Sequence, residues 1–190
     1  MLESLVNLDK SLFLFLNGLH APWLDQVMYW ATQTLVWAPF YLFLLWLVVR
    51  KFGTRTLWVL LFVVLMITAG DQLSGLFKEG VQRLRPSQDT SLTGVHIVNG
   101  YRGGLYSFYS AHASNTFSLA VFLVLVLRRH YKWISAVLIP WAFILSYSRI
   151  YLGVHFPGDM LAGMVAGILL GLLFGFGFLR LSRYFAPNGR

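Results

Sequence analysis

The sequence predicts an all-α polytopic membrane protein, a helical bundle of five to six helices that residues 1–190 form as a single domain. The chain is 57% hydrophobic and only 12% charged. Its mean hydropathy of +0.66 lies outside the range of ordinary soluble domains. A helix needs ~20 apolar residues to cross a membrane, so 190 residues allow five or six crossings joined by short loops.

The charge and the cysteine count exclude several classes of function. A formal charge of +8 on so apolar a chain fits membrane topology and anionic headgroups. No basic run with interleaved aromatics stands apart from the apolar segments, so we expect membrane lipids and no nucleic acid among the partners. The chain has no cysteine, which excludes disulfide bonds and thiolate metal or redox sites.

The first part of the chain predicts an N-terminal helix and two crossings. Residues 1–20 place leucine and phenylalanine on one helical stripe, which indicates an amphipathic helix in the membrane interface or, alternatively, a first short span. The uncharged stretch 26–49 predicts the first crossing. The second begins after Arg55 and continues as a helix toward Phe77.

The rest of the chain predicts an outer loop and three more crossings. Residues 71–110 form the outer loop, and 87–108 within it is rich in Gly, Ser, Thr and Tyr without a sustained period. Loops of that length are often functional. Apolar stretches predict crossings over 111–127, 133–147 and 158–179.

Basic residues orient these five crossings. All of the basic turns then fall on one side, which the positive-inside rule makes cytoplasmic. The loop 71–110 and the turn 148–158 share the opposite face, so we expect a protein integral to the cytoplasmic (inner) membrane with its polar site facing the periplasmic or outer side. The basic residues are Arg50, Lys51, Arg55, Arg128, Arg129, Lys132, Arg180, Arg183 and Arg190.

The first polar cluster lies at the start of the outer loop. Lys78 and Arg85 are seven residues apart, about two helical turns, so on a continuing helix their side chains point the same way. Pro86 favours a helix end at Arg85. Taken alone, the two cations also fit side chains that snorkel to lipid headgroups.

The second cluster, Ser110-Ala111-His112, opens the third crossing. Unpaired backbone N–H groups and the helix dipole favour an anion there. Ser110 can cap the helix or donate to a phosphate oxygen. A single histidine at a helix start also fits an interfacial role, so this cluster alone does not predict catalysis.

The third cluster lies in the turn before the last crossing. Pro157 suits the first turn of a helix, which places Asp159 in that turn and His155 just ahead of it. A carboxylate in this position can accept a hydrogen bond from one imidazole nitrogen and leave the other free to act. The alternative is that Asp159 only stabilises the helix N-terminus.

Together the three clusters resemble the signature of the type 2 phosphatidic acid phosphatase (PAP2) superfamily, which is shared with vanadium haloperoxidases and bacterial acid phosphatases. The first and third motifs match in full. The middle motif, usually Pro-Ser-Gly-His, has Tyr and Ala in place of Pro and Gly; Ala keeps the backbone N–H but loses the conformational freedom of Gly. The resemblance implies a PAP2/haloperoxidase-like core. The motifs read Lys78-x6-Arg85-Pro86, Tyr109-Ser110-Ala111-His112 and Ser148-Arg149-x5-His155-x3-Asp159.

The resemblance also implies catalytic roles. His155 would attack phosphorus to form a phosphohistidine, with Asp159 orienting it. His112 would protonate the leaving group and then activate water. We expect no cofactor and no metal, because the three cations would repel a divalent ion and no His-Glu-x-x-His spacing is present. The substrate-binding residues would be Lys78, Arg85, Ser110, Ala111 and Arg149.

The substrate implied by the family is a lipid phosphate. Undecaprenyl diphosphate is our first expectation, by analogy with small members of the family. Phosphatidylglycerophosphate, phosphatidic acid, a lipid A phosphate, or phosphotransfer to a lipid acceptor are the alternatives. A non-enzymatic lipid-binding or transport protein would need the cations but not the pair His112 and His155 with Asp159.

Two features remain outside the motifs. Glycines recur every four residues along the last crossing, which predicts close helix packing, either within the chain or in a homodimer. Of the residues without motif support, His96 and Arg102 lie in the outer loop and could help to select a headgroup. The glycines are Gly163, Gly167, Gly171 and Gly175, and the other unassigned histidines are His20 and His130.

Overall fold

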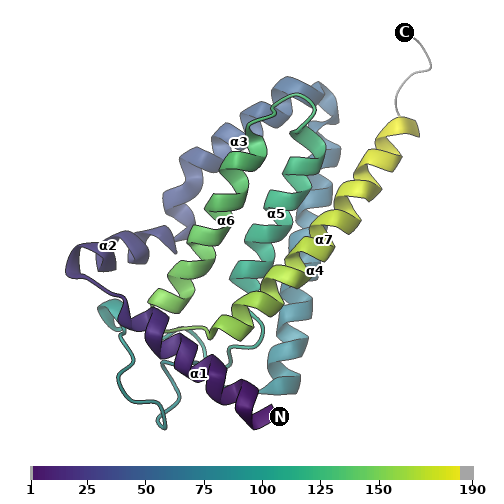
Figure 1. Ribbon diagram of the computed structural model, residues 1–190. Coiled ribbons are helices and arrows are strands. Elements are labelled where there is room, and N and C mark those ends of the chain that lie inside the picture. The colour runs from purple at the N-terminus through teal and green to yellow at the C-terminus, as the bar shows by residue number, and fades with distance from the viewer. Residues whose placement is uncertain (1, 185–190) are drawn as a thin grey trace.

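The computed structural model describes residues 2–184, and over this range it contains helices, turns and loops but no strand. Five helices stand together as a bundle, and the other two lie near one of its ends (Figure 1). The predicted all-α membrane bundle is confirmed. The bundle helices are α3 (Ala38–Phe52), α4 (Thr56–Val81), α5 (Ala111–Leu127), α6 (Ile134–Tyr151) and α7 (Pro157–Tyr184); the other two are α1 (Leu2–Gly18) and α2 (Pro22–Ala31).

The five bundle helices correspond to the five predicted crossings. Among the described residues, three segments are long and apolar enough to cross a membrane, namely Thr34–Val81, Ile134–Tyr151 and Pro157–Arg183, and Ala111–Leu127 is a shorter apolar helix. The first of these segments holds both α3 and α4, which a short 3-10 turn joins. The chain is therefore an integral membrane protein.

The start of the first crossing was predicted wrongly. Instead of one helix over 26–49, α2 ends at Ala31, a 3-10 turn follows at Thr34–Trp37, and α3 begins only at Ala38. Pro39 occupies the first turn of α3, where a missing N–H costs nothing. The bend coincides with the polar residues Thr32, Gln33 and Thr34, which interrupt the apolar run too briefly to divide the predicted crossing.

The outer loop also begins later than predicted. Residues 71–81 belong to α4, so Lys78 is helical and the loop runs over 82–110. The helix ends at Val81 and does not reach Arg85, because Gln82 adopts a left-handed conformation and its N–H bonds back to the carbonyl of Lys78. Arg85 is held instead by the loop itself, since its N–H donates to Leu105 O at 3.1 Å.

Helix α5 lies at the centre of the bundle and packs against α4, α6 and α7. The glycines of α7 allow its close approach: a methyl group at Gly163 would lie 2.5 Å from Ser110 O, and one at Gly171 would lie 2.7 Å from Ser118 O. Of the two predicted uses of this glycine face, the structure therefore shows packing within the chain.

Helix α1 lies across the end of the bundle that carries the long loop (Figure 1). Phe13 is fully buried there and packs edge-on against Phe156, with ring centroids 5.3 Å apart. Asn17, also fully buried, donates to the carbonyls of Ile150 and Tyr151 at the end of α6. These contacts anchor the N-terminal segment directly beneath the polar residues of the third motif.

Candidate active site

The predicted site residues meet at one end of the bundle. The C-terminal ends of α4 and α6 and the N-terminal ends of α5 and α7 all lie there, next to the loop 82–110. The basic turns after α3 and α5 and the C-terminal end of α7 lie at the opposite end (Figure 1). Four helix ends and one loop thus build a single polar site from three segments that are distant in the sequence.

His155 and Asp159 form the buried centre of this site. Their side chains are 3% and 0% exposed, and His155 Nδ1 lies 3.6 Å from Asp159 Oδ2. That distance is longer than a hydrogen bond but allows strong electrostatic interaction in a buried site. Asp159 Oδ2 also accepts from the N–H of Phe156 at 2.9 Å, so the first turn of α7 fixes the carboxylate, as the position of Pro157 predicts.

The other imidazole nitrogen faces a cation. His155 Nε2 lies 3.2 Å from Arg85 Nη1, and because a guanidinium can only donate, Nε2 must accept and the ring proton belongs on Nδ1, toward Asp159. Burial, together with Arg85 and Arg149, lowers the pKa of His155 to about 3 against the opposing effect of Asp159. His155 is therefore a neutral imidazole at physiological pH, with its lone pair on the side of the arginines.

The two arginines are buried and held by neutral partners. Arg85 donates to Val154 O at 3.2 Å. Arg149 donates to the hydroxyl groups of Thr32 and Tyr101, and its guanidinium lies 5.3 Å from the centre of the Tyr101 ring. Among the described residues, the Nε atoms of both arginines have no hydrogen-bond partner. Two buried guanidiniums that form no ion pair with a carboxylate within residues 2–184 make a site that favours an anion.

The second motif adds polar groups from the start of α5. Ser110 is fully buried and caps the helix, its Oγ accepting from the N–H of Ala113 at 3.3 Å. His112 lies close enough to interact electrostatically with Arg149 and His155, and its buried Nε2 has no hydrogen-bond partner among the described residues. The middle motif therefore joins the same site as the other two.

The two departures in the middle motif leave this geometry intact. Tyr109 is buried against α4, where its carbonyl accepts from Ser74 Oγ at 3.1 Å and its hydroxyl donates to Gly70 O at 3.4 Å. Ala111 is the first residue of α5, a helical position that does not need the freedom of glycine. Tyr109 thus anchors the loop on α4 in place of proline.

Lys78 completes the set of cations from the last turn of α4. It is half-buried and close enough to interact electrostatically with Arg85, Arg149 and Asp159. Lys78 and Arg85 thus lie near the same site, although they do not share the helix that the sequence predicts. Their approach depends on the turn at Gln82.

Arg83 belongs to the site although no sequence pattern predicts it. Its guanidinium donates to Asp159 Oδ1 at 2.9 Å and to Asp9 Oδ2 at 2.8 Å, and it lies 3.9 Å from the centre of the Phe156 ring. Asp9 also accepts from the N–H of Gly158 at 2.7 Å. Arg83 occupies a variable position of the first motif and its partners are more than 70 residues away, so only the fold reveals the contact.

The arrangement provides what a phosphoryl transfer requires. A neutral imidazole is oriented by a carboxylate, a second imidazole lies nearby, and three cations surround them. The PAP2 superfamily model matches residues 56–181, which include every one of these groups. The chain belongs to the PAP2 superfamily. It is an integral-membrane phosphatase built on the common helical core of that superfamily.

Two bacterial relatives resemble this PAP2 member in sequence. The chain is 41% identical to a lipid A 4'-phosphatase of Bacteroides thetaiotaomicron over 167 residues, which cover 86% of this chain and 73% of that protein. It is 35% identical to a lipid A 4'-phosphatase of Porphyromonas gingivalis over 167 residues, covering 86% and 70%.

Two crystal structures share its fold. The PAP2-type phosphatidylglycerolphosphate phosphatase from Bacillus subtilis superposes with a TM-score of 0.75 at 22% identity, covering 95% of this chain and 89% of that one. Aquifex aeolicus LpxE superposes with a TM-score of 0.67 at 26% identity, covering 86% and 92%.

Proposed function

We propose that this PAP2 phosphatase removes a phosphate group from lipid A or a similar phosphorylated glycolipid. The observation that carries the proposal is the 41% identity to a lipid A 4'-phosphatase over 86% of the chain. A second relative of the same name supports it. These relatives favour a lipid A phosphate over undecaprenyl diphosphate, which the sequence analysis ranked first.

The geometry supports a phosphohistidine mechanism. His155 Nε2 would attack phosphorus while Arg85, Arg149 and Lys78 bind the phosphoryl oxygens and stabilise their charge. The bond between phosphorus and the leaving oxygen breaks, and His112, which the negative charge of the bound phosphate holds in its protonated form, gives its proton to this oxygen.

In the second step His112 takes a proton from water, the hydroxide attacks phosphorus, and the bond to Nε2 breaks to release phosphate. Asp159 stabilises the positive charge on His155 during the first step. Ser110 and the N–H of Ala111 would add neutral donors at the start of α5, where the helix dipole favours the phosphate. No step requires a metal ion.

A groove on the side of the bundle can hold an apolar chain. It has a volume of about 510 Å³, lies between α3, α4 and α5, and is lined almost wholly by apolar side chains such as Leu42, Val63 and Leu119. Leu119 is two helical turns below His112 on α5, about 10 Å along the helix. An acyl chain in this groove would leave its headgroup at the level of the site.

A second cavity lies in the outer loop. Its volume is about 330 Å³, and its lining residues include Pro86, Ser87 and Arg102. Pro86 is the residue that follows Arg85 in the sequence. Arg102 also donates to Ser87 O at 2.7 Å, which braces this part of the loop. A sugar headgroup would meet this loop first, and Arg102 is the cation best placed to help select it.

The location follows from the charge asymmetry of the two ends. The basic turns at the end opposite the site favour the cytoplasmic side. We therefore place the protein in the cytoplasmic (inner) membrane with its site on the periplasmic or outer side. There it would meet lipid headgroups of the outer leaflet.

Phosphate release by the detergent-purified protein tests the proposal. The substrates are lipid A bisphosphate, phosphatidylglycerophosphate, phosphatidic acid and undecaprenyl diphosphate, each with and without chelator, and mass spectrometry identifies the phosphate lost from lipid A. We expect the highest kcat/KM on lipid A, activity that survives chelator, and none in His155→Ala. Activity confined to undecaprenyl diphosphate would overturn the substrate, and phosphate release by His155→Ala would overturn the mechanism.

Phosphatidylglycerophosphate is the second candidate substrate. The phosphatidylglycerophosphatase B of Bacillus subtilis is 31% identical to this chain over 151 residues, covering 75% of this chain and 69% of that protein. The same panel distinguishes the two lipids, since a higher kcat/KM on phosphatidylglycerophosphate than on lipid A would favour this candidate.

A further inference from the structure

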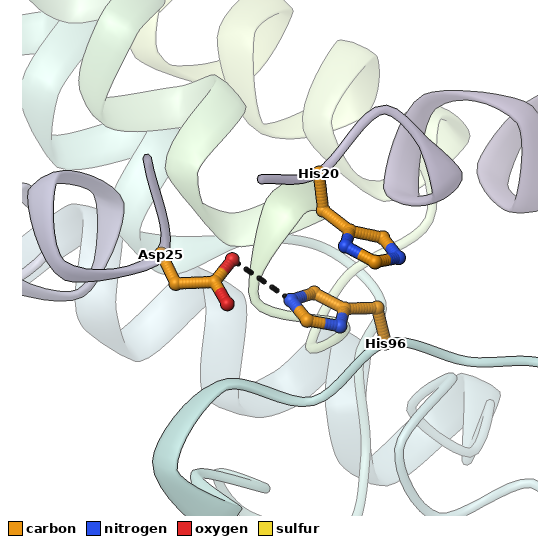
Figure 2. Close-up of side chains that lie close together, drawn as sticks. All are labelled: His20, Asp25 and His96. Carbon is orange, nitrogen blue, oxygen red and sulfur yellow. Dashed lines mark hydrogen bonds and ion pairs between the residues drawn. The ribbon is translucent and has the colours of Figure 1, made fainter. Parts of the chain in front are cut away.

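Three side chains that the mechanism does not use converge beside the phosphate site. His20 lies in the linker between α1 and α2, Asp25 lies in the first turn of α2, and His96 projects from the long loop toward both (Figure 2). One ligand atom from each lies within 4.8 Å of the others. No motif connects them, and His20 and His96 are 76 positions apart in the sequence.

We propose that His20, Asp25 and His96 form a binding site for a divalent transition-metal ion of the zinc class, which braces the long loop against the N-terminal segment. Two imidazole nitrogens and one carboxylate oxygen are a common three-residue ligand set for Zn²⁺, with water as the fourth ligand. The site differs from the phosphate site in its residues, since it joins one carboxylate to two imidazoles and contains no arginine or lysine.

Buried groups position two of the three ligands. Asn17, which is fully buried, accepts from the backbone N–H of His96 at 2.7 Å and donates to its carbonyl at 3.1 Å. Tyr151, also fully buried, donates its hydroxyl proton to Asp25 Oδ1 at 2.6 Å. Supporting contacts of this kind orient the ligands of metal sites and raise their affinity.

The third ligand is free to adjust. The rings of His20 and His96 are stacked, with centroids 3.8 Å apart and planes at 3°, as Figure 2 shows. The lone pair of an imidazole lies in the plane of its ring, so two parallel rings cannot both point at one ion. His20 is exposed, so its ring can rotate out of the stack to complete a tetrahedral set.

An ion pair alone explains the cluster less well. His96 Nε2 lies 2.9 Å from Asp25 Oδ1, which accounts for two of the residues. Among the described residues His20 makes no hydrogen bond to that pair, and its contact with His96 is ring stacking. A metal ion uses all three side chains and replaces the direct contact between His96 and Asp25.

Binding would tie together parts of the fold that touch the phosphate site. His96 precedes Tyr101 in the loop, and Tyr101 contacts Arg149. Asp25 is bonded to Tyr151, two residues after Arg149 on α6. A metal ion here would therefore restrain the loop beside a phosphate-binding cation without entering the reaction.

The test measures Zn²⁺ binding to the full chain, purified in detergent with a tag that contains no histidine and stripped with chelator. We expect one Zn²⁺ per chain by titration calorimetry and elemental analysis, and a rise in Tm on the order of 5 °C at saturating Zn²⁺. His20→Asn and His96→Asn should each weaken binding at least about tenfold and abolish the rise. His130→Asn, in the turn after α5 at the other end of the bundle, is the matched control.

Because His20 is exposed, His20→Asn should keep the wild-type Tm without metal, and this shows that lost binding is not lost folding. The proposal is overturned if the wild-type chain binds no Zn²⁺, or if His20→Asn and His96→Asn bind it as tightly as His130→Asn does. It is also overturned if His155→Ala abolishes binding, since the ion would then lie in the phosphate site. None of these outcomes bears on phosphatase activity.

Discussion

Arg83 provides the sharpest test of how the fold supports the chemistry. It connects Asp9 on α1 to Asp159 on α7 through two charge-assisted hydrogen bonds of 2.8 and 2.9 Å. Asp159 in turn faces His155. We therefore class Arg83 as a positioning residue and expect Arg83→Met, which keeps much of the side-chain volume over Phe156, to impair catalysis without touching phosphate.

The expected magnitude follows from burial. A hydrogen bond to a charged group contributes ~1.5–3 kcal/mol, and breaking a fully buried ion pair costs ~3–5 kcal/mol. Asp159 is fully buried but the Arg83 side chain is 22% exposed, so water replaces part of the lost interaction and about 2 kcal/mol remains. At 1.36 kcal/mol per factor of ten, kcat should fall about 30-fold.

The pH dependence of kcat/KM separates positioning from a merely structural role. Only the neutral imidazole of His155 can attack, so activity has an acid limb at the pKa of His155. Removing Arg83 leaves the charge of Asp159 uncompensated, which raises the pKa of His155. The acid limb should then move to higher pH, and phosphate release from the best lipid substrate, measured from about pH 2.5 to pH 9 so that the wild-type limb near the pKa of His155 is included, gives the shift.

Lys10→Met is the matched control. Lys10 follows Asp9 on α1 and, like Arg83, forms an ion pair between α1 and the loop, with Asp89 at 3.0 Å, but this ion pair does not include Asp159. It should keep the wild-type kcat and pH profile. If Arg83→Met retains the wild-type kcat and acid limb, Arg83 does not position Asp159 for catalysis. A lower Tm with an unchanged acid limb would reduce Arg83 to a structural contact.

Three further predictions concern packing, proton linkage and the phosphate-binding cations. Gly167→Ala places a methyl group against a backbone carbonyl of α5 and should lower the free energy of unfolding by ~1–3 kcal/mol. Gly75→Ala on α4 places a methyl group with nothing within 4 Å and should leave the free energy of unfolding unchanged or raise it. The Tm of each variant in detergent measures the effect. His155 has its pKa lowered to about 3 in the folded state from ~6.5 in the unfolded state, so the unfolded chain binds the proton first and stability should fall as pH drops below about 6.5. His155→Gln should remove up to ~1.4 kcal/mol of this loss per pH unit, and a Tm series from pH 8 to 4.5 that is parallel in both proteins would contradict the assignment. Thr32→Val removes an acceptor of Arg149 and should lower kcat/KM about tenfold with little change in Tm, which steady-state phosphate release measures; an unchanged kcat/KM would show that Tyr101 alone holds the guanidinium.

Much of the candidate site could be predicted because its chemistry is local in sequence. Pro157 followed by Asp159 indicates a helix start with a carboxylate in its first turn, and His155 must then lie beside it. The position of Ser110 before an apolar stretch indicates a helix cap in the same way. Such short-range rules depend only on backbone geometry, and the structure follows them at both places.

The errors lie where backbone turns and long-range contacts decide. The helix through Arg85 was wrong because Gln82, which is not a glycine, adopts the left-handed conformation that ends α4. The break after Ala31 was missed because only Thr32, Gln33 and Thr34 interrupt an otherwise apolar stretch. A hydropathy pattern shows that a segment is buried in lipid or protein but not where its axis bends.

By itself the sequence determined the class of the protein, the number of bundle helices and the residue types that gather at one end, because hydropathy, charge asymmetry and motif spacing are local properties. Only the tertiary structure decided which of those residues touch. It joined Arg83 to Asp159, placed Arg85 against His155, and brought His20 and His96 together from segments 76 positions apart. Contacts of this kind depend on how helix ends and loops pack in three dimensions, and no sequence period encodes that packing.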